Sequence, residues 1–336
     1  MPYFVREENH LFNNRTFFTM KRIIGIGETV FDIIFKNNQP QAAVPGGSTF
    51  NSMISLGRTA AKHGKAEVLM ISETGSDQVG DIIASFMEDN GVSVKAVTRA
   101  PGTQTQISLA FLDEKNDAHY EFYKGSNQAS LNVSKVENLD IGRDDIVLFG
   151  SFFAINPDIR DFTRTLLMKA RLAGAIIYYD INFRKNYKKD LPELFNNIEE
   201  NCKLSDFVRG SVDDFDCLFD NTNPEYIYSE KIKDLCPNLI VTRGDKSTEY
   251  FRSDGQHFSF PVEPIETVST IGAGDNFNAG FIYGLLDADI RREECHCLEE
   301  AILTRSLNMA CRFSSNVCRS FNNYVDNVFN PENLCK

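Results

Sequence analysis

A glycine-rich segment with an acid at its middle, residues 271–280, has the residue types that phosphoryl transfer to a hydroxyl needs. At a helix start the amides of Gly272, Ala273 and Gly274 would be unpaired and open to an anion, because glycine brings no Cβ. Asp275 in the first turn would take the proton of the attacking alcohol. Apolar residues at helical spacing behind the loop predict an amphipathic helix: Phe277, Phe281, Ile282, Leu285 and Leu286.

The same loop has a structural alternative, in which the glycines make a turn and Asp275 only stabilises the helix N-terminus. No Gly-Lys-Ser/Thr follows the loop, so it is not the phosphate-binding loop of P-loop proteins. On the loop alone the two interpretations have equal weight. In both, the helix dipole favours the ionised carboxylate, so we expect Asp275 to be a weak base.

The composition limits the classes of function. The 336 residues, 42% of them hydrophobic, suffice for one large α/β domain. A net charge of −12 disfavours nucleic acid or an anionic membrane as a partner. The chain has no run of 18 apolar residues, and residues 1–19 do not read as a signal peptide. The eight cysteines include no Cys-x-x-Cys pair, which favours a reducing, cytoplasmic setting over a zinc or disulfide framework.

Strand and helix patterns alternate along most of the chain. This alternation predicts an α/β fold with a doubly wound, mostly parallel sheet flanked by helices, and ligands at the carboxyl ends of the strands. Helices are predicted at residues 157–173 and 299–313, and edge strands at 249–252 and 257–261. Short apolar runs predict strands at residues 21–27, 66–72, 146–150, 175–179 and 238–242, and residues 207–214 are predicted to pass from a strand into a helix.

Two further segments could shape a site. Gly46 and Gly47 precede a helix that is predicted to run to about Lys62, with Ser48 as its N-cap. The alternating runs 104–112 and 118–124 predict a β-hairpin. One face of this hairpin carries Ile107, Leu109 and Phe111, so it could pack on a second copy of the chain or within one subunit, and the sequence weights these alternatives equally.

The glycine-rich loop resembles the C-terminal signature of the PfkB, or ribokinase-like, family of carbohydrate kinases. The matching residues are Thr270, Gly272, Ala273, Gly274, Asp275, Phe277, Ala279 and Gly280. Other short matches follow in family order over residues 21–320, among them Gly46, Gly47 and Asn51. The resemblance implies a ribokinase-like kinase domain over residues 20–336, with a small β lid from about 28–45 and 104–124. We expect residues 1–19 to be a poorly ordered extension before a natural start at Met20.

The resemblance also implies roles for single residues. Asp275 would be the base of an ATP- and Mg²⁺-dependent kinase, and the amides of Gly272, Ala273 and Gly274 would form its anion hole. The acceptor would be held by Asp32, Gly46, Gly47, Asn51, Asn182 and Arg184. The nucleotide would be contacted by Ser211, Thr242, Gly244 and Asn308, with Asp214 near the metal. For Ser211 and Asp214, an N-cap with first-turn acids is the alternative.

The substrate stays open at this level. A primary hydroxyl of a ketohexose such as fructose fits a neutral pocket, and 2-keto-3-deoxygluconate follows because Arg184 could bind its carboxylate. Nucleosides are a further alternative, and a sugar- or nucleotide-binding regulator without catalysis is an alternative of another class. Ser269 stands where the family pattern has an Asp that often binds a monovalent cation, which argues against potassium activation. A homodimer through the β lid is a further expectation from the resemblance.

Overall fold

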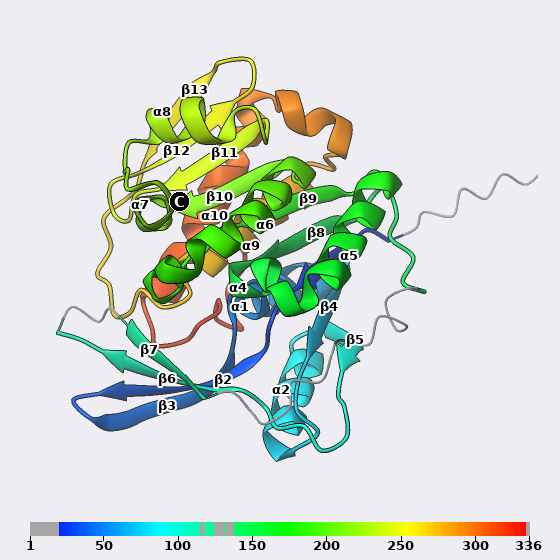
Figure 1. Cartoon of the computed structure of the whole chain (residues 1–336), viewed down its shortest axis with the longest axis vertical. Helices are drawn as coiled ribbons and strands as arrows, with labels where there is room; N and C mark the ends of the chain where they lie inside the picture. The colour runs from blue at the N-terminus through cyan, green and yellow to red at the C-terminus, as the bar shows by residue number, and fades with distance from the viewer. Residues whose placement is uncertain (1–19, 115–117, 124–130, 132–137, 334–336) are drawn as a thin grey trace, which may run out of the picture.

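The structure, a computed structural model, describes residues 20–114, 118–123, 131 and 138–333; the predicted extension at residues 1–19 lies outside them. Within these residues the apolar runs form a nine-stranded sheet with the order β13-β12-β11-β10-β9-β8-β1-β4-β5 (Figure 1). Its strands are β1 (Arg22–Ile26), β4 (Glu67–Glu73), β5 (Val92–Thr98), β8 (Ile146–Gly150), β9 (Ile176–Asp180), β10 (Phe207–Ser211), β11 (Asn238–Thr242), β12 (Ser247–Arg252) and β13 (His257–Pro261).

The pairing confirms a doubly wound, mostly parallel sheet. From β1 the chain adds β4 and β5 on one side and β8 to β11 on the other, and all these pairs are parallel. The hairpin of β12 and β13 then adds antiparallel pairs at one end. The prediction of an edge strand at residues 249–252 is wrong, because β12 pairs with β11 and with β13, and β13 is the edge strand of this hairpin.

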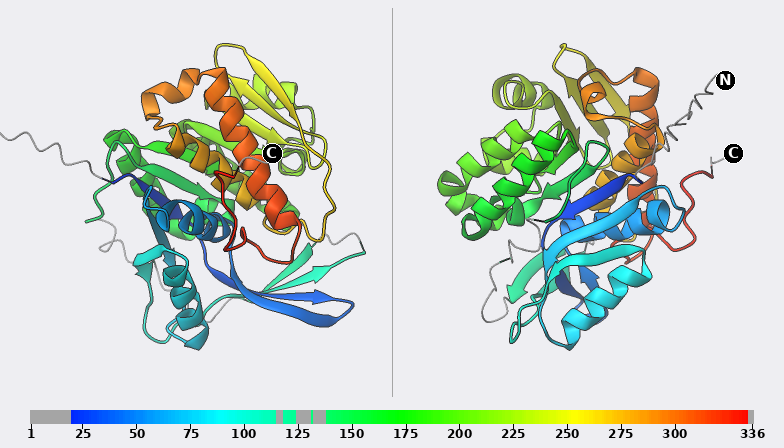
Figure 2. Two further views of the ribbon diagram at one scale, coloured as in Figure 1. Left: turned by 180° about the vertical axis from the view of Figure 1, so that it is seen from behind. Right: turned by 90° about the vertical axis from the view of Figure 1, so that its right-hand side faces the viewer.

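Helices cover both faces of the sheet (Figures 1 and 2). Successive strand residues point to opposite faces, so Ile23 and Ile24 of β1 join two different hydrophobic clusters. One face carries α4 (Ser151–Ile155), α5 (Arg160–Ala173), α6 (Leu191–Leu204), α7 (Val212–Phe219) and α8 (Pro224–Ile227), and the other α1 (Ser48–Leu56), α2 (Gln78–Asp89), α9 (Ala273–Asp287) and α10 (Glu300–Cys318). None of the described helices is both long and apolar enough to cross a membrane.

Helix α9 lies at the centre of one face and corrects the sequence analysis. Every residue from Asn276 to Leu286 is buried, so the helix has no solvent-exposed polar stripe over this stretch. The expected amphipathic helix is therefore wrong, because α1 and α10 pack against α9 and cover it from solvent. A helix buried in this way holds its first turn rigidly.

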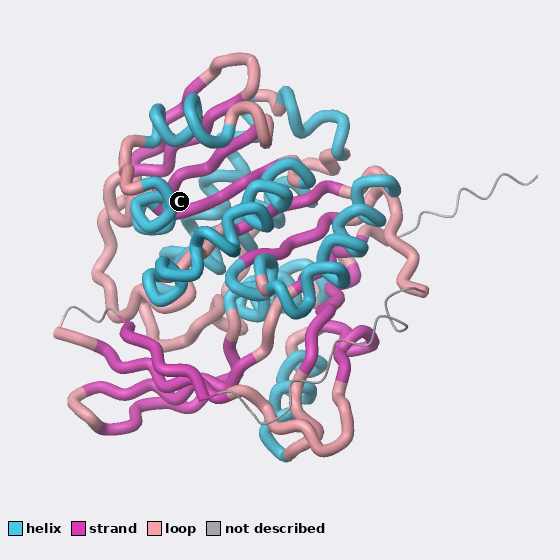
Figure 3. Tube along the Cα trace, in the orientation of Figure 1, coloured by secondary structure: helices cyan, strands magenta, loops and turns pink. Residues whose placement is uncertain are grey.

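A second sheet stands apart from the first (Figure 3). It has the order β3-β2-β6-β7, and the predicted hairpin is confirmed as the antiparallel pair β6 and β7. Ile34, Ala110 and Leu112 pack on Ile271, so this sheet rests on the segment that leads into α9. Its strands are β2 (Val30–Lys36), β3 (Gln39–Gly46), β6 (Ile107–Leu112) and β7 (Ala118–Tyr123).

Candidate active site

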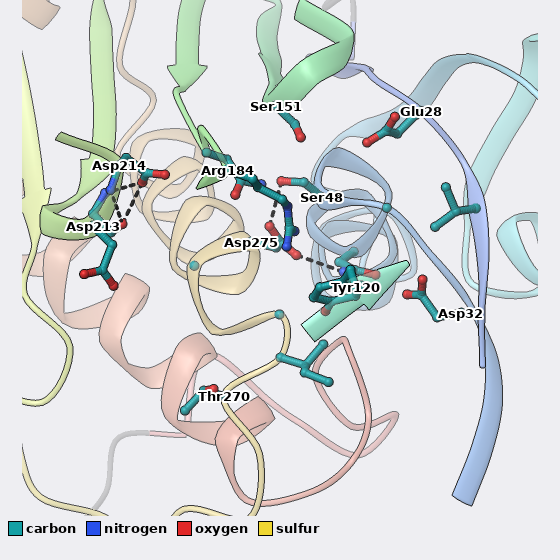
Figure 4. Close-up of a pocket in the computed structure, with 18 of the residues that line it drawn as sticks. Glu28, Asp32, Ser48, Tyr120, Ser151, Arg184, Asp213, Asp214, Thr270 and Asp275 are labelled. Atoms are coloured by element: carbon teal, nitrogen blue, oxygen red, sulfur yellow. Dashed lines mark hydrogen bonds between the residues drawn. The ribbon is translucent and has the colours of Figure 1, made fainter. Parts of the chain in front are cut away.

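A pocket of about 580 Å³ lies between the carboxyl ends of the main strands and the second sheet (Figure 4). This is the place where ligands bind in open α/β sheets. Most of the predicted site residues line it: Asp32, Gly47, Asn51, Asn182, Arg184, Ser211, Asp214, Gly272, Gly274 and Asp275. Residues more than 240 positions apart in the sequence thus share one pocket.

The start of α9 requires its glycines. Gly272 is left-handed, with φ of 76°, and a Cβ on it would lie 2.7 Å from the carbonyl oxygen of Asn323. A Cβ on Gly274 would lie 2.9 Å from Nη1 of Arg209. The amide of Ala273 was expected to be unpaired and open to an anion, but it donates to the carbonyl of Thr270 at 3.2 Å. Gly272 and Gly274 line the pocket, so they remain the predicted anion-binding positions.

The carboxylate of Asp275 points into the same pocket (Figure 4). Its Oδ1 accepts a hydrogen bond from Ser48 Oγ at 2.7 Å, and its Oδ2 accepts one from Asn51 Nδ2 at 2.8 Å. Burial raises the pKa of Asp275 to about 6 despite these donors. The expectation of a weak base is therefore wrong, because loss of water around the carboxylate outweighs the helix dipole.

Ser48 has a different role from the one that its sequence position suggested. The N-cap of α1 is Gly47, which has no capping side chain, and Ser48 is the first residue of the helix. Gly47 is left-handed with φ of 123°, and a Cβ there would lie 2.5 Å from the carbonyl oxygen of Glu28. The hydroxyl of Ser48 is thus free to reach across to Asp275. No local signal in the sequence indicates this contact.

Arg209 on β10 is a site residue that the sequence analysis missed. It is buried, donates to Asp180 Oδ1 at 3.1 Å and to Thr242 Oγ1 at 2.7 Å, and lines the pocket beside Gly274. Its Nε has no hydrogen-bond partner among the described residues. A charged residue inside an otherwise apolar strand was the available signal. The guanidinium places a fixed positive charge next to the helix start that is predicted to bind an anion.

Asp32 lies on β2, on the second-sheet side of the pocket. It accepts hydrogen bonds from Ser108 Oγ and, at 3.2 Å, from Asn323 Nδ2. Burial raises its pKa to about 6, and nearby Arg184 opposes that rise. Gly46 does not line the pocket but packs directly behind this carboxylate, where a Cβ would collide with Oδ2. Asp32 therefore lines the pocket with one donor on each oxygen and a second lone pair left on each.

Asn182 and Arg184 follow β9 and face the second sheet. Asn182 lines the pocket in a left-handed conformation with φ of 37°, which Asn tolerates better than most residues. The guanidinium carbon of Arg184 lies 4.6 Å from the ring centroid of Tyr120 on β7. The negative charges of Asp275, Glu28 and Asp214 also act on the Arg184 guanidinium. The contact between Arg184 and Tyr120 joins the main sheet to the second sheet, at the end of the pocket that is predicted to hold the acceptor.

The predicted nucleotide residues divide into two groups. Ser211 and Asp214 line the pocket, and they also form a capping box at the start of α7, as the structural alternative proposed. Thr242 accepts the hydrogen bond of Arg209. Gly244 lies in open space and does not line this pocket. Asn308 lines a second pocket together with Tyr283 and Arg312, so the structure does not bring it to Asp275.

The side chains around the pocket fit a magnesium ion that is bound mainly by phosphate oxygens better than one bound mainly by protein ligands. Among the described residues no three His, Cys, Asp or Glu side chains gather to hold a metal ion. Mg²⁺ at nucleotides takes one or two carboxylates and completes its shell with phosphate oxygens and water. The Asp214 carboxylate lines the pocket, and its hydrogen bonds from Ser211 both use Oδ2. One carboxylate is therefore suitably placed, and its pKa is raised by burial.

These features define an α/β protein whose pocket joins a glycine-bounded helix start to a hydrogen-bonded carboxylate and to polar side chains beside the second sheet. Residues 20–326 match the family model described as pfkB family carbohydrate kinase. The chain therefore belongs to this family of carbohydrate kinases, whose members are ATP-using phosphotransferases. The family assignment agrees with the ribokinase-like doubly wound fold seen here.

Individual relatives are distant. The chain is 26% identical over 262 residues to a 5-dehydro-2-deoxygluconokinase of Geobacillus kaustophilus (strain HTA426), with 72% of each chain covered. It is 24% identical over 288 residues to a fructokinase of Rhizobium leguminosarum bv. trifolii, with 84% of this chain and 85% of that one covered. The structure of a fructokinase from Vibrio cholerae O395 with fructose, ADP and calcium ion has a TM-score of 0.75 at 20% identity, covering 90% of this chain and 94% of that one. This last likeness establishes the shared fold.

Proposed function

We propose that the protein transfers the γ-phosphate of ATP to a primary hydroxyl of a small sugar, with a ketohexose such as fructose as the preferred acceptor. The observation that carries this proposal is the carboxylate of Asp275, which both Ser48 and Asn51 hold at the edge of the Gly272–Gly274 helix start. A base beside an anion site is what phosphoryl transfer to an alcohol requires. The fructokinase among the relatives supports the choice of acceptor.

Each end of the pocket has its own task in the proposed reaction. The backbone at Gly272 and Gly274 and the guanidinium of Arg209 would stabilise the charge of the transferring group. Asp275 would accept the proton of the attacking hydroxyl. Asp32 would hold and orient the sugar, together with Asn51 and Asn182. Asn51 Oδ1 is buried with no partner among the described residues, so a substrate hydroxyl can donate to it.

We propose that the reaction uses Mg²⁺ and that Asp214 helps to hold it. Mg²⁺ bound to the phosphates would neutralise negative charge as the phosphoryl group moves. Ser211 keeps the Asp214 carboxylate at the pocket wall through the capping box. The small sheet would act as a lid and exclude water, since water would otherwise compete with the sugar for the phosphoryl group.

A sugar acid is the second candidate acceptor. Arg184 lines the pocket against the ring of Tyr120, and a substrate carboxylate could pair with its guanidinium in a two-pronged contact. The 5-dehydro-2-deoxygluconokinase among the relatives supports this candidate. Nucleosides remain a weaker alternative. A non-catalytic regulator is disfavoured by the intact pair of Asp275 and the glycine-bounded helix start.

A turnover screen tests the proposed function. Purified protein with Mg-ATP is assayed for ADP release against fructose, 2-keto-3-deoxygluconate, 5-dehydro-2-deoxygluconate and a set of nucleosides. We expect sugar-dependent ADP release, fastest with fructose, and phosphate on a primary hydroxyl by NMR of the product. Faster turnover of a sugar acid than of fructose would identify the second candidate as the acceptor. Binding of sugar or ATP without any turnover would instead establish the regulator.

Potassium should not activate the enzyme. Ser269 is buried, brings no carboxylate, and uses its Oγ to accept a hydrogen bond from the amide of Ile271 at 3.2 Å. A monovalent cation therefore loses the anionic ligand that would offset its dehydration. We expect initial rates with potassium, sodium or tetramethylammonium chloride at equal ionic strength to agree within about twofold. A selective potassium response would show that backbone oxygens alone complete the site.

We propose a homodimer through the second sheet. The hairpin residues Ser108, Ala110 and Leu112 are buried, whereas Ile107, Leu109 and Phe111 are only partly covered. Phe111 stacks on Phe35 with 5.1 Å between ring centroids, so the less covered side carries an aromatic cluster. An apolar face of this kind favours burial against a second copy. Light scattering should give twice the chain mass, and a Leu109→Lys variant should give the monomer mass; a monomeric wild-type protein would refute this.

We infer a reducing compartment, such as the cytoplasm. All the cysteines in the described residues are free, and disulfides are common in oxidising compartments. Cell fractionation with the protein's own antibody tests this inference, which a secreted pool would contradict.

A further inference from the structure

The two oxygens of the Asp275 carboxylate have donors of different chemistry. Oδ1 accepts from the Ser48 hydroxyl at 2.7 Å and Oδ2 from the Asn51 amide at 2.8 Å (Figure 4). Both donors belong to α1, and Ser52 of the same helix donates to the backbone carbonyl of Asp275 at 2.7 Å. Helix α1 therefore fixes both the carboxylate and the backbone of this residue.

Hydrogen-bond chemistry distinguishes the two donors. The amide nitrogen of Asn51 can only donate, and the opposite amide orientation would place two acceptor oxygens together while Asp275 is ionised. The Ser48 hydroxyl is a short donor that holds Oδ1 at 2.7 Å. Each carboxylate oxygen keeps a second lone pair, so both donors can hold Asp275 while a free lone pair receives a proton.

We infer that Ser48 is a positioning residue for the base, because its hydroxyl holds Oδ1 of Asp275 and favours the ionised carboxylate, an inference that rests on the proposed function. In the step, the sugar oxygen forms a bond to the γ-phosphorus while the bond from that phosphorus to the bridging oxygen of ADP breaks. The sugar proton moves to a free lone pair of the Asp275 carboxylate and later passes to water. Ser48 keeps the carboxylate directed into the pocket throughout.

The pH dependence of the reaction reports on this contact. Three charged or titratable groups of the described residues face Asp275. Asp180 is the last residue of β9, Arg184 follows this strand, and Tyr120 lies on the second sheet. Burial raises the pKa of Asp275 to about 6, and the Ser48 and Asn51 donors oppose that rise. The base works only when ionised, so activity falls as the pH drops through this pKa. Removing the Ser48 donor raises the pKa and moves the acid limb to higher pH.

The Ser48→Ala variant tests the inference with kinetics. We expect the acid limb of kcat to move up by roughly 1 pH unit, so kcat should fall about 3-fold at pH 6.5 and about 8-fold at pH 5.5. KM for the sugar should stay within about twofold, because Ser48 acts through Asp275 rather than on the substrate. Ser48→Thr keeps the hydroxyl and should restore the wild-type acid limb. An unmoved limb in Ser48→Ala would overturn the inference.

Ser52→Ala is the matched control. It removes a hydroxyl from the same helix, and that hydroxyl contacts the backbone rather than the carboxylate of Asp275. Its acid limb should coincide with that of the wild type, even if its denaturation midpoint falls. Equal shifts in Ser48→Ala and Ser52→Ala would mean that α1 acts only as a scaffold, which refutes the specific role of Ser48.

A ligand-free measurement separates this inference from the proposed function. Carbon-13 NMR of labelled aspartate, assigned through Asp275→Asn, follows the titration of Asp275 without ATP or sugar. The midpoint should be higher in Ser48→Ala than in the wild type, and an unchanged midpoint would refute the contact. A wild-type protein that turns over no sugar would refute the proposed function, yet this titration would still report whether Ser48 holds Oδ1.

Discussion

The Asp275→Asn variant should lose at least ~10²-fold in kcat while its affinity for the sugar stays nearly unchanged. The amide has the shape of the carboxylate, and its oxygen can still accept from Asn51 while its NH₂ group donates to Ser48. Fold and acceptor contacts are thus kept, and only the proton acceptor is lost. Steady-state kinetics with the best sugar of the screen, together with sugar binding by calorimetry, measure the two quantities.

The control for this variant is Asp289→Asn at the far end of α9. Asp289 has a side chain that is 79% exposed and a left-handed backbone, with φ of 56°, which Asn also adopts. Its kcat should match the wild type. Turnover in Asp275→Asn within a few-fold of the wild type would remove Asp275 from the role of base. Some residual activity is expected, since positioning and charge stabilisation contribute most of the catalysis in loose phosphoryl transfer.

The Arg209→Met variant should lose about 3 kcal/mol or more of unfolding free energy. Asp180, with a side chain only 2% exposed, would then be buried without its cation and would keep only its hydrogen bond from Asn278 at 2.7 Å. Thr242 would lose its donor as well. Urea denaturation followed by circular dichroism measures the change. The same variant should also lose kinase activity, because the positive charge beside Gly274 would no longer stabilise the transferring phosphoryl group.

Two further variants make the test specific. Arg305→Met removes a cation that is 62% exposed and paired with Asp287 at the surface, so it should cost no more than about 1 kcal/mol. The double variant Arg209→Met/Asp180→Asn should be more stable than the sum of its single variants predicts, because the unpaired charge is removed. Additive losses would mean that Arg209 and Asp180 do not stabilise each other.

The acid–base behaviour of this site depends on burial more than on the helix dipole. Asp275 stands in the first turn of α9, where the dipole favours ionisation, yet burial raises its pKa to about 6. Burial also raises the pKa of Asp32 to about 6, although this residue lies on a strand and not at a helix end. A dipole acts through partial charges at the helix end, whereas removal of water affects the whole charge of the carboxylate. Tertiary packing therefore brings both carboxylates to pKa values near 6.

The sequence by itself determined the local features. Its short β-branched runs and their spacing specified the parallel strands, because side-chain periodicity and strand propensity act within a few residues. The positions of Gly47 and Gly272 specified two left-handed helix starts, since other residues are strained there. The family pattern around Asp275 indicated the proposed base. These signals sufficed to predict the class of fold and about half of the residues that line the pocket.

Only the tertiary structure decided how these parts meet. The contact of Ser48 with Asp275 joins positions 227 residues apart, and Asn323 reaches Asp32 over 291 residues. The place of Asn308 in another pocket and the buried pair of Arg209 and Asp180 were likewise set by packing. Sequence periodicity cannot specify such contacts. It indicates which positions of α1 or of α9 share a face of the helix, but not which polar group of one helix will lie against the other. That choice is made when the two helices pack, and the reactivity of the proposed base depends on it.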